Sequence, residues 1–131
     1  MIEISEELTR EMNKYLDGTT IEEIITKNRK MFRFQMMLKP EHMEQSIDSM
    51  DFSVRAHHCL KRAGINTVGE LVEHCYAKPE ATSKKQLQQY RNLGRTSADE
   101  ILIKLFCYQF SILPDYRKSA YMKWVAEANR P

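Results

Sequence analysis

Hydrophobic residues in the first part of the chain recur at the three-to-four-residue spacing of an amphipathic helix. Two groups have this spacing: Leu8, Met12, Tyr15 and Leu16, and then Ile21, Ile24, Ile25, Met31 and Phe32. Ser5 is placed to cap the first helix, and Gly18 can end it in a left-handed conformation. Thr20 and Glu23 have the spacing of a capping box, which predicts the start of a second helix.

A proline closes this helical part of the sequence. "MFRFQMMLKP" continues the apolar pattern and stops at Pro40, because proline disfavours helix at the residue before it. "EHMEQSIDSM" has no clear period and predicts a connector. We expect a new helix from its N-cap Ser53 to Gly64, and a short one capped by Asn66 or Thr67.

The clearest helical pattern follows Gly94. Pro79 and its polar neighbours predict a loop before it, with a short helix near residues 84–90. Ser97 and Glu100 form an S-x-x-E capping box. The apolar face of this helix is Ile101, Leu102, Leu105, Phe106 and Ile112; Pro114 closes it, and a last helix carries Tyr121, Trp124 and Val125. The pattern therefore predicts an all-α protein.

Composition narrows the class of protein further. The sequence has 131 residues with only 4 Gly and 4 Pro, too few for a loop-rich β fold. No apolar run approaches the roughly 18 residues of a membrane span, and the acidic start "MIEISEELTR" does not resemble a signal peptide. Three cysteines without a secretory signal indicate reduced thiols. We therefore expect a cytoplasmic protein that does not bind membranes.

Charge is divided unevenly between the two parts of the sequence. Residues 1–45 hold 7 Lys/Arg against 9 Asp/Glu, whereas residues 46–131 hold 13 against 9. An anionic partner would bind the second part.

The sequence offers little for metal binding or catalysis. Its His and Cys residues from position 57 onward are His57, His58, Cys59, His74, Cys75 and Cys107. They lack the C-x-x-C and H-x-x-x-H spacing of metal sites. No Ser or Cys lies in a nucleophile motif, and no carboxylate cluster suggests metal-dependent hydrolysis. We expect no metal, no cofactor and no enzymatic activity, with Cys107 packed as a small apolar side chain.

Two stretches point to a nucleic-acid interface. In "RNLGRTSADEI", Gly94 allows a close approach to the first amides of the next helix, where a phosphate oxygen fits, and Arg95 adds charge. In "SVRAHHCLKRAGI", helical spacing places one basic stripe on a face: Arg55, His58, Cys59 and Arg62. Val54, Leu60 and Ala63 are expected to turn toward the core. The alternatives are an ordinary turn and a solvated helix face.

"MDFSVRAHHCLKRAGINTVGELV" and the later "RNLGRTSADEILIKL" together resemble the C-terminal domain of the bacterial RNA polymerase alpha subunit, over roughly residues 46–113. The resemblance implies a compact all-α domain with a helix-hairpin-helix-like element. Such domains bind A·T-rich upstream promoter DNA across the minor groove and contact activators and sigma factors. The family's main DNA-contacting arginine falls on Arg55, and its other contact positions fall on His58, Cys59, Gly94, Thr96 and Ser97.

The sequence departs from the family at several positions. The family usually has asparagine at His58 and lysine at Thr96, and the segment before Gly94 is longer, with Lys84 and Lys85 able to restore basic charge. The loss of that lysine should flatten the salt dependence of DNA binding by roughly one unit. The polymerase-assembly domain of an alpha subunit is missing from this sequence, so we expect a free-standing bacterial or phage protein associated with the nucleoid.

These observations give one overall hypothesis. Residues 1–45 form a helical extension, residues 46–113 a DNA-binding domain and residues 114–131 a C-terminal helix. The protein would bind double-stranded DNA as a small transcription regulator or RNA polymerase accessory. Alternatively, it docks on sigma factor, an activator or polymerase without touching DNA. "MFRFQMML" is expected to pack in the core, or else to expose a binding face, and the N-terminal helices are candidates for a homodimer contact.

Overall fold

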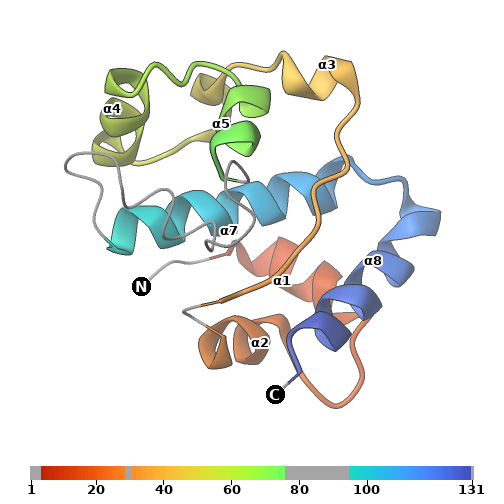
Figure 1. Ribbon diagram of the computed structural model, residues 1–131. Helices are drawn as coiled ribbons and strands as arrows, with labels where there is room; N and C mark the ends of the chain where they lie inside the picture. The colour runs from red at the N-terminus through yellow and green to blue at the C-terminus, as the bar shows by residue number, and fades with distance from the viewer. Residues whose placement is uncertain (1–3, 29–30, 76–94, 131) are drawn as a thin grey trace. The chain divides into compact units, whose positions relative to one another are not determined.

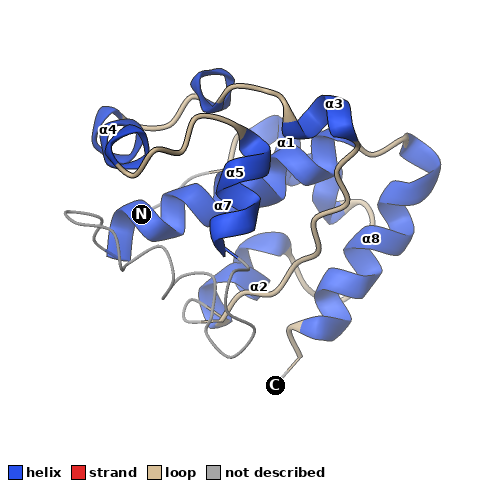
Figure 2. Cartoon of the chain, turned by 45° about the horizontal axis from the view of Figure 1, so that its top comes forward, coloured by secondary structure: helices blue, strands red, loops and turns tan. Residues whose placement is uncertain are grey.

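The computed structural model describes residues 4–28, 31–75 and 95–130. In these ranges all regular structure is helical, apart from one isolated antiparallel bridge between Ser46 and Thr67 (Figure 2). The elements in order along the sequence are α1 (Glu6–Asn13), α2 (Ile21–Lys27), α3 (Pro40–Met43), the 3-10 helix η1 (Ile47–Met50), α4 (Val54–Arg62), α5 (Val68–Cys75), α7 (Arg95–Ile112) and α8 (Asp115–Ala128) (Figure 1). The predicted all-α class is confirmed. The helix predicted near residues 84–90 lies outside the described residues.

The protein packs as two units. Unit 1 holds Met36–Leu105, and unit 2 holds Glu3–Gln35 with Phe106–Pro131. The continuous helix α7 contributes residues to both units. The division at residues 45 and 113 that the sequence predicts stays a prediction. None of the described helices is long and apolar enough to cross a membrane.

Hydroxyl side chains begin most of the short helices. Ser5, Thr20 and Ser53 cap α1, α2 and α4 as predicted, and Thr67, rather than its neighbour Asn66, caps α5. Each hydroxyl accepts a hydrogen bond from the amide three residues later, at 3.1–3.2 Å. These bonds satisfy amides that have no partner inside the helix.

Glycines with positive φ follow two of the helices. Gly64 (φ +81°) comes directly after Ala63, the C-cap of α4, as the sequence predicts. Gly18 (φ +74°) lies in the turn between α1 and α2. The first helix ends earlier, at Asn13, whose side-chain oxygen accepts the amide of Ile21 at 2.8 Å. Asn13 thus connects the end of α1 to the start of α2.

Unit 1 has an apolar core beneath α4 and α5. Its fully buried members include Ile47, Leu60, Ile65, Val68, Leu71, Ala98 and Ile101. Helix α5 also approaches α3 closely, because Gly69 faces Met43. A Cβ at Gly69 would lie 2.9 Å from the Cβ and 3.0 Å from the carbonyl oxygen of Met43. The contact between α3 and α5 therefore depends on the missing side chain.

Unit 2 is built around Phe106. Its ring lies 5.0 Å from that of Phe32, edge to face, and 5.6 Å from that of Phe34. The carboxamide of Asn129 binds both backbone groups of Arg33: its oxygen accepts the amide and its nitrogen donates to the carbonyl, each at 2.8 Å. The Tyr121 hydroxyl donates to the Gln35 carbonyl at 2.9 Å. Side chains of α7 and α8, with Asn129 just beyond α8, thus hold the segment around residues 32–35.

That segment differs from the sequence prediction. Helix α2 ends at Lys27, and after the turn at Met31 residues 32–39 form no helix. Pro40 begins α3 instead of ending a helix, at a position where its missing amide is harmless. The core interpretation of "MFRFQMML" holds for the buried Phe34, whereas Met31 and Met37 are 48% and 39% exposed.

Candidate nucleic-acid interface

Helix α4 presents a basic face. Arg55, His58 and Arg62 are all exposed and follow the i, i+3, i+7 spacing of one helix face. Cys59 was predicted to share this face, but only 5% of it is exposed. Its small side chain lies toward the buried Leu60 side of the helix, so the prediction of an exposed Cys59 is wrong. We call Arg55, His58 and Arg62 the basic stripe.

Val54 is exposed where the sequence predicted burial, the reverse of the outcome for Cys59. It was expected in the core, yet it is 73% exposed beside Arg55. In a helix, Val54 points about 160° away from Ala56, which is fully buried together with Leu60. Those two residues, rather than Val54, attach α4 to unit 1.

Helix α7 anchors the first turn of α4 through Glu100. One carboxylate oxygen of Glu100 accepts the Ser53 amide at 2.6 Å, and the other accepts the Ser53 hydroxyl at 2.7 Å. One turn later, Lys104 donates to the carbonyl of Asp51, which has a left-handed φ of 54°. The carboxylate also lies at the positive end of the α4 dipole. The backbone entering α4 is therefore fixed at two points by α7.

The predicted capping box of Ser97 and Glu100 is consequently wrong. Helix α7 already begins at Arg95, so Ser97 lies inside the helix, where it is 7% exposed. Glu100 is directed to Ser53 of α4 instead of to its own helix start. The S-x-x-E spacing therefore does not mark the start of a helix here.

The Glu100–Ser53 contact brings the two predicted halves of the interface to one side of unit 1. Arg55 is two residues beyond Ser53, and Arg95 and Thr96 begin α7 within about 8 Å of Glu100 along the helix axis. Figures 1 and 2 both show α4 over the N-terminal end of α7. The remaining predicted contacts, Gly94, Lys84 and Lys85, lie outside the described residues.

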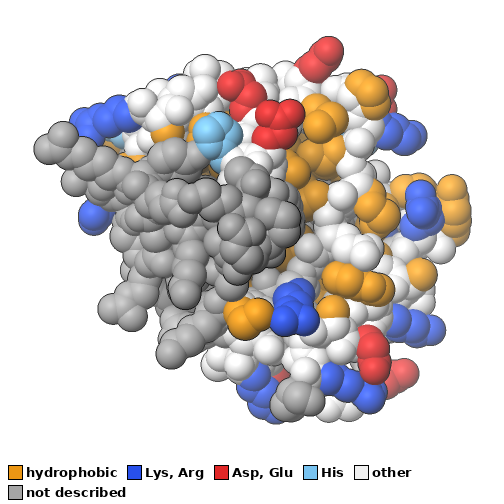
Figure 3. All heavy atoms as spheres, in the orientation of Figure 1, with side chains coloured by type: hydrophobic (Ala, Val, Ile, Leu, Met, Phe, Trp, Pro, Cys, Tyr) orange, Lys and Arg blue, Asp and Glu red, His pale blue; other side chains and the backbone are white. Residues whose placement is uncertain are grey.

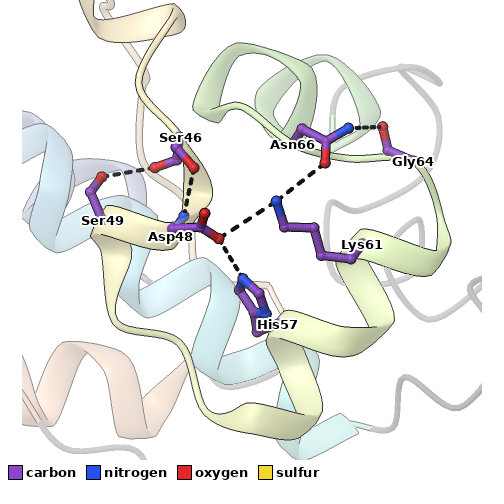
Figure 4. Close-up of polar contacts among 7 residues, drawn as sticks. All are labelled: Ser46, Asp48, Ser49, His57, Lys61, Gly64 and Asn66. Atoms are coloured by element: carbon purple, nitrogen blue, oxygen red, sulfur yellow. Dashed lines mark hydrogen bonds and ion pairs between the residues drawn. The ribbon is translucent and has the colours of Figure 1, made fainter.

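A second polar cluster on α4 was not predicted from the sequence (Figure 4). A carboxylate oxygen of Asp48 on η1 lies 2.6 Å from the Nε2 atom of His57 and 3.5 Å from the Nζ atom of Lys61. Lys61 also donates to the side-chain oxygen of Asn66 at 3.3 Å, and Asn66 donates to the Gly64 carbonyl at 3.3 Å. The cluster ties both neighbouring loops to α4.

The cluster also lowers the pKa of the Asp48 carboxyl group. Hydrogen bonds from His57 and then from Ser46 hold the pKa of Asp48 below its ordinary value. No local spacing signals this cluster, because Asp48 lies nine residues before His57 in another element. Asp48 places a negative charge next to a helix whose other face carries the basic stripe.

The cysteines have no arrangement suited to metal binding in the described part of the protein. No group of three His, Cys, Asp or Glu side chains there could hold a metal ion. Cys59 and Cys75 are buried, and burial raises the pKa of the Cys75 thiol to about 12. A thiol with this pKa stays protonated at neutral pH. Cys107 is partly exposed rather than fully packed.

About half of the chain is similar to known bacterial proteins. The family described as the C-terminal domain of the bacterial RNA polymerase alpha chain matches residues 36–106. A protein named DNA-directed RNA polymerase subunit alpha from Oceanobacillus iheyensis is 45% identical over 67 residues, which are 51% of this chain and 19% of that protein. Its namesake from Carboxydothermus hydrogenoformans is 46% identical over 67 residues, with the same shares. The namesake from Symbiobacterium thermophilum is 40% identical over 70 residues, 53% of this chain and 20% of that protein.

The chain thus spans about a fifth of the length of these relatives. No solved structure matches it significantly.

Proposed function

Because the protein belongs to the family of C-terminal domains of the bacterial RNA polymerase alpha chain, we propose that it binds double-stranded DNA, as a small transcription regulator or a polymerase accessory. The observation that carries the proposal is the basic stripe of α4 beside the start of α7. DNA is a polyanion, and a line of cations next to a helix N-terminus suits its backbone.

Each residue of the basic stripe has a proposed role. Arg55 enters the minor groove, whose negative potential is greatest where A·T-rich DNA narrows it. His58 and Arg62 lie one and two turns further along the same face and contact the flanking backbone. Cys59 is buried, so we propose that it does not contact DNA and instead packs under the helix face that carries the basic stripe.

The start of α7 would hold one phosphate group. This helix is 18 residues long, and its first amides have no partner within the helix. We assign the phosphate to the backbone amides around Arg95, Thr96 and Ser97, approached closely at Gly94. Lys84 and Lys85 would steer DNA toward this position.

A second candidate function is docking on sigma factor, an activator or polymerase without DNA contact. The observation in its favour is Val54, an apolar side chain that is 73% exposed next to Arg55. Thr96, which replaces a lysine of the family, also favours it. The two functions differ in salt dependence, because a phosphate-binding surface loses affinity steeply as salt rises and an apolar one does not.

The test is a titration of fluorescent duplexes of mixed and A·T-rich sequence at two salt concentrations. Arg55→Ala should weaken binding by about 1–3 kcal/mol and reduce the A·T preference, whereas Arg62→Ala should lower the salt slope by about one. Arg10→Ala, which removes an exposed arginine from α1, is the matched control. Unchanged duplex affinity in Arg55→Ala would refute the assignment.

Pairing of two copies through the N-terminal helices is a separate part of the proposal. Sedimentation of the protein with and without duplex DNA would test it, because a dimer doubles the protein mass per bound duplex.

A further inference from the structure

Helix α8 carries large apolar side chains on two faces. Tyr121, Met122 and Val125 are buried in unit 2. On the other side, Tyr116 is 83% and Trp124 is 38% exposed. Figure 3 shows hydrophobic side chains next to Lys or Arg side chains over the region of α8. Packing within unit 2 explains the buried residues and leaves the two exposed rings without a structural role.

The charges on α8 are also not balanced. Each acid of this helix forms an ion pair with a cation three residues further along: Asp115 with Lys118 at 3.2 Å, and Glu127 with Arg130 at 3.3 Å. Two further cations, Arg117 and Lys123, are exposed and form no ion pair with any residue that the structure describes. Their charge is therefore available to an anionic ligand.

Helical spacing places these four residues on one side of α8. Lys123 comes seven residues after Tyr116, and Trp124 seven residues after Arg117, so the members of each of these pairs point within about 20° of each other. The directions of the two pairs differ by about 100°. The helical rise separates the two cations by about 9 Å and the two rings by about 12 Å along the axis. Each end of this face thus offers one flat ring together with one cation. Such pairs suit a polymeric ligand in which anionic groups and flat rings alternate.

We propose that this face of α8 binds single-stranded DNA, with bases stacked on Tyr116 and Trp124 and phosphates held by Arg117 and Lys123. Aromatic rings bind unstacked bases regardless of sequence, whereas the base faces of a duplex are covered by their neighbours. The choice of DNA over RNA rests on the proposed function of unit 1. The existence of a site on α8 does not rest on that function, because residues 115–128 lie outside the family match at 36–106.

The sequence provides a built-in probe for this site, since Trp124 is its single tryptophan. Stacking of a base on the indole should quench Trp124 fluorescence when an oligothymidine of about 12 nucleotides is added, and a blunt hairpin duplex should quench it little. In anisotropy titrations of the labelled oligonucleotide, Tyr116→Ala should weaken binding roughly 5–150-fold. Arg117→Ala/Lys123→Ala should lower the salt slope by about 1.4, or about 0.7 for each lost phosphate contact.

Controls separate this site from folding and from unit 1. Lys14→Ala removes an exposed cation elsewhere in unit 2 and should leave oligothymidine affinity unchanged. Trp124→Phe keeps a stacking ring, so it should retain most of the affinity while abolishing the tryptophan signal. Circular dichroism verifies that each variant is folded. If the wild-type protein binds oligothymidine but not duplex DNA, only the proposed function of unit 1 is refuted. If it binds duplex DNA but not oligothymidine, only the α8 proposal is refuted.

Four outcomes would overturn the α8 proposal. The first is the absence of oligothymidine binding. The second is an unaltered salt slope in the double variant. The third is equal quenching by a polyglutamate peptide, which would indicate an acidic protein partner. The fourth is much tighter binding of oligouridine RNA than of the DNA oligomer.

Discussion

The anchor between α7 and α4 gives the most direct test of how the proposed DNA-binding side of unit 1 is built. Replacing Glu100 with alanine removes two hydrogen bonds to a carboxylate, at 2.6 and 2.7 Å from the amide and hydroxyl of Ser53. Hydrogen bonds to charged groups contribute about 1.5–3 kcal/mol each. Ser53 is exposed, so water replaces part of this energy, and we expect a total loss of about 2 kcal/mol.

The assay is urea unfolding followed by circular dichroism. With a denaturant slope of about 1–3 kcal/mol per molar, a loss of this size lowers the midpoint by about 1 M. Glu100→Gln keeps one acceptor oxygen without the charge, so its loss should be about half as large. Glu73→Ala, an exposed glutamate on α5, is the matched control and should change stability by less than about 0.5 kcal/mol.

A double-mutant cycle isolates the contact itself. Ser53→Ala also removes the cap of α4, which alone costs about 1 kcal/mol. If Glu100 acts through Ser53, the combined variant should lose about 1 kcal/mol less than the sum of the two single losses. Additive losses, or a Glu100→Ala protein as stable as the Glu73→Ala control, would refute this account of α4.

Two further variants test features of unit 1. Gly69→Ala should lower the melting temperature, because the new Cβ lies 2.9–3.0 Å from Met43 and overpacking costs about 1–3 kcal/mol, more than the gain of about 1 kcal/mol in helix propensity; an unchanged or higher melting temperature would contradict the close approach. Asp48→Asn should lower stability at neutral pH and have little effect in acid. The pKa of Asp48 is lowered on folding, so its contribution is complete above its ordinary value of 3.8 and disappears as the pH falls below it. The stability difference between wild type and variant should therefore shrink between about pH 5 and pH 2, and a constant difference would refute the role of the Asp48–His57 contact.

The features predicted correctly from the sequence are local ones. The caps at Ser5, Thr20 and Ser53 and the left-handed Gly64 depend on residues within one turn of the backbone. A hydroxyl three residues before an amide, or a glycine after a helix, has its effect whatever the rest of the fold does. The basic stripe was equally predictable, since helical spacing alone places Arg55, His58 and Arg62 on one face.

The features that were missed depend on partners distant in sequence. Glu100 binds Ser53, 47 residues away, and its S-x-x-E spacing from Ser97 was coincidental. Residues 32–39 keep an apolar pattern that fits a helix, but Phe32 and Phe34 pack on Phe106 of α7 instead. The prediction for Cys59 failed for a different reason. Cys59 points only about 40° around the helix from Arg55, and at that angle a side chain as small as cysteine is already covered by its neighbours.

The bond between Asn129 and Arg33 also sets which substitutions the protein tolerates. From residue 33 the carboxamide binds the backbone amide and carbonyl and no side-chain atom, so any residue except proline can supply the same two groups. Position 129 has no such freedom, because among neutral side chains of its length only asparagine donates and accepts side by side. In a library that varies both positions, residue 33 should therefore be replaced freely, while selection for folded protein returns asparagine at 129.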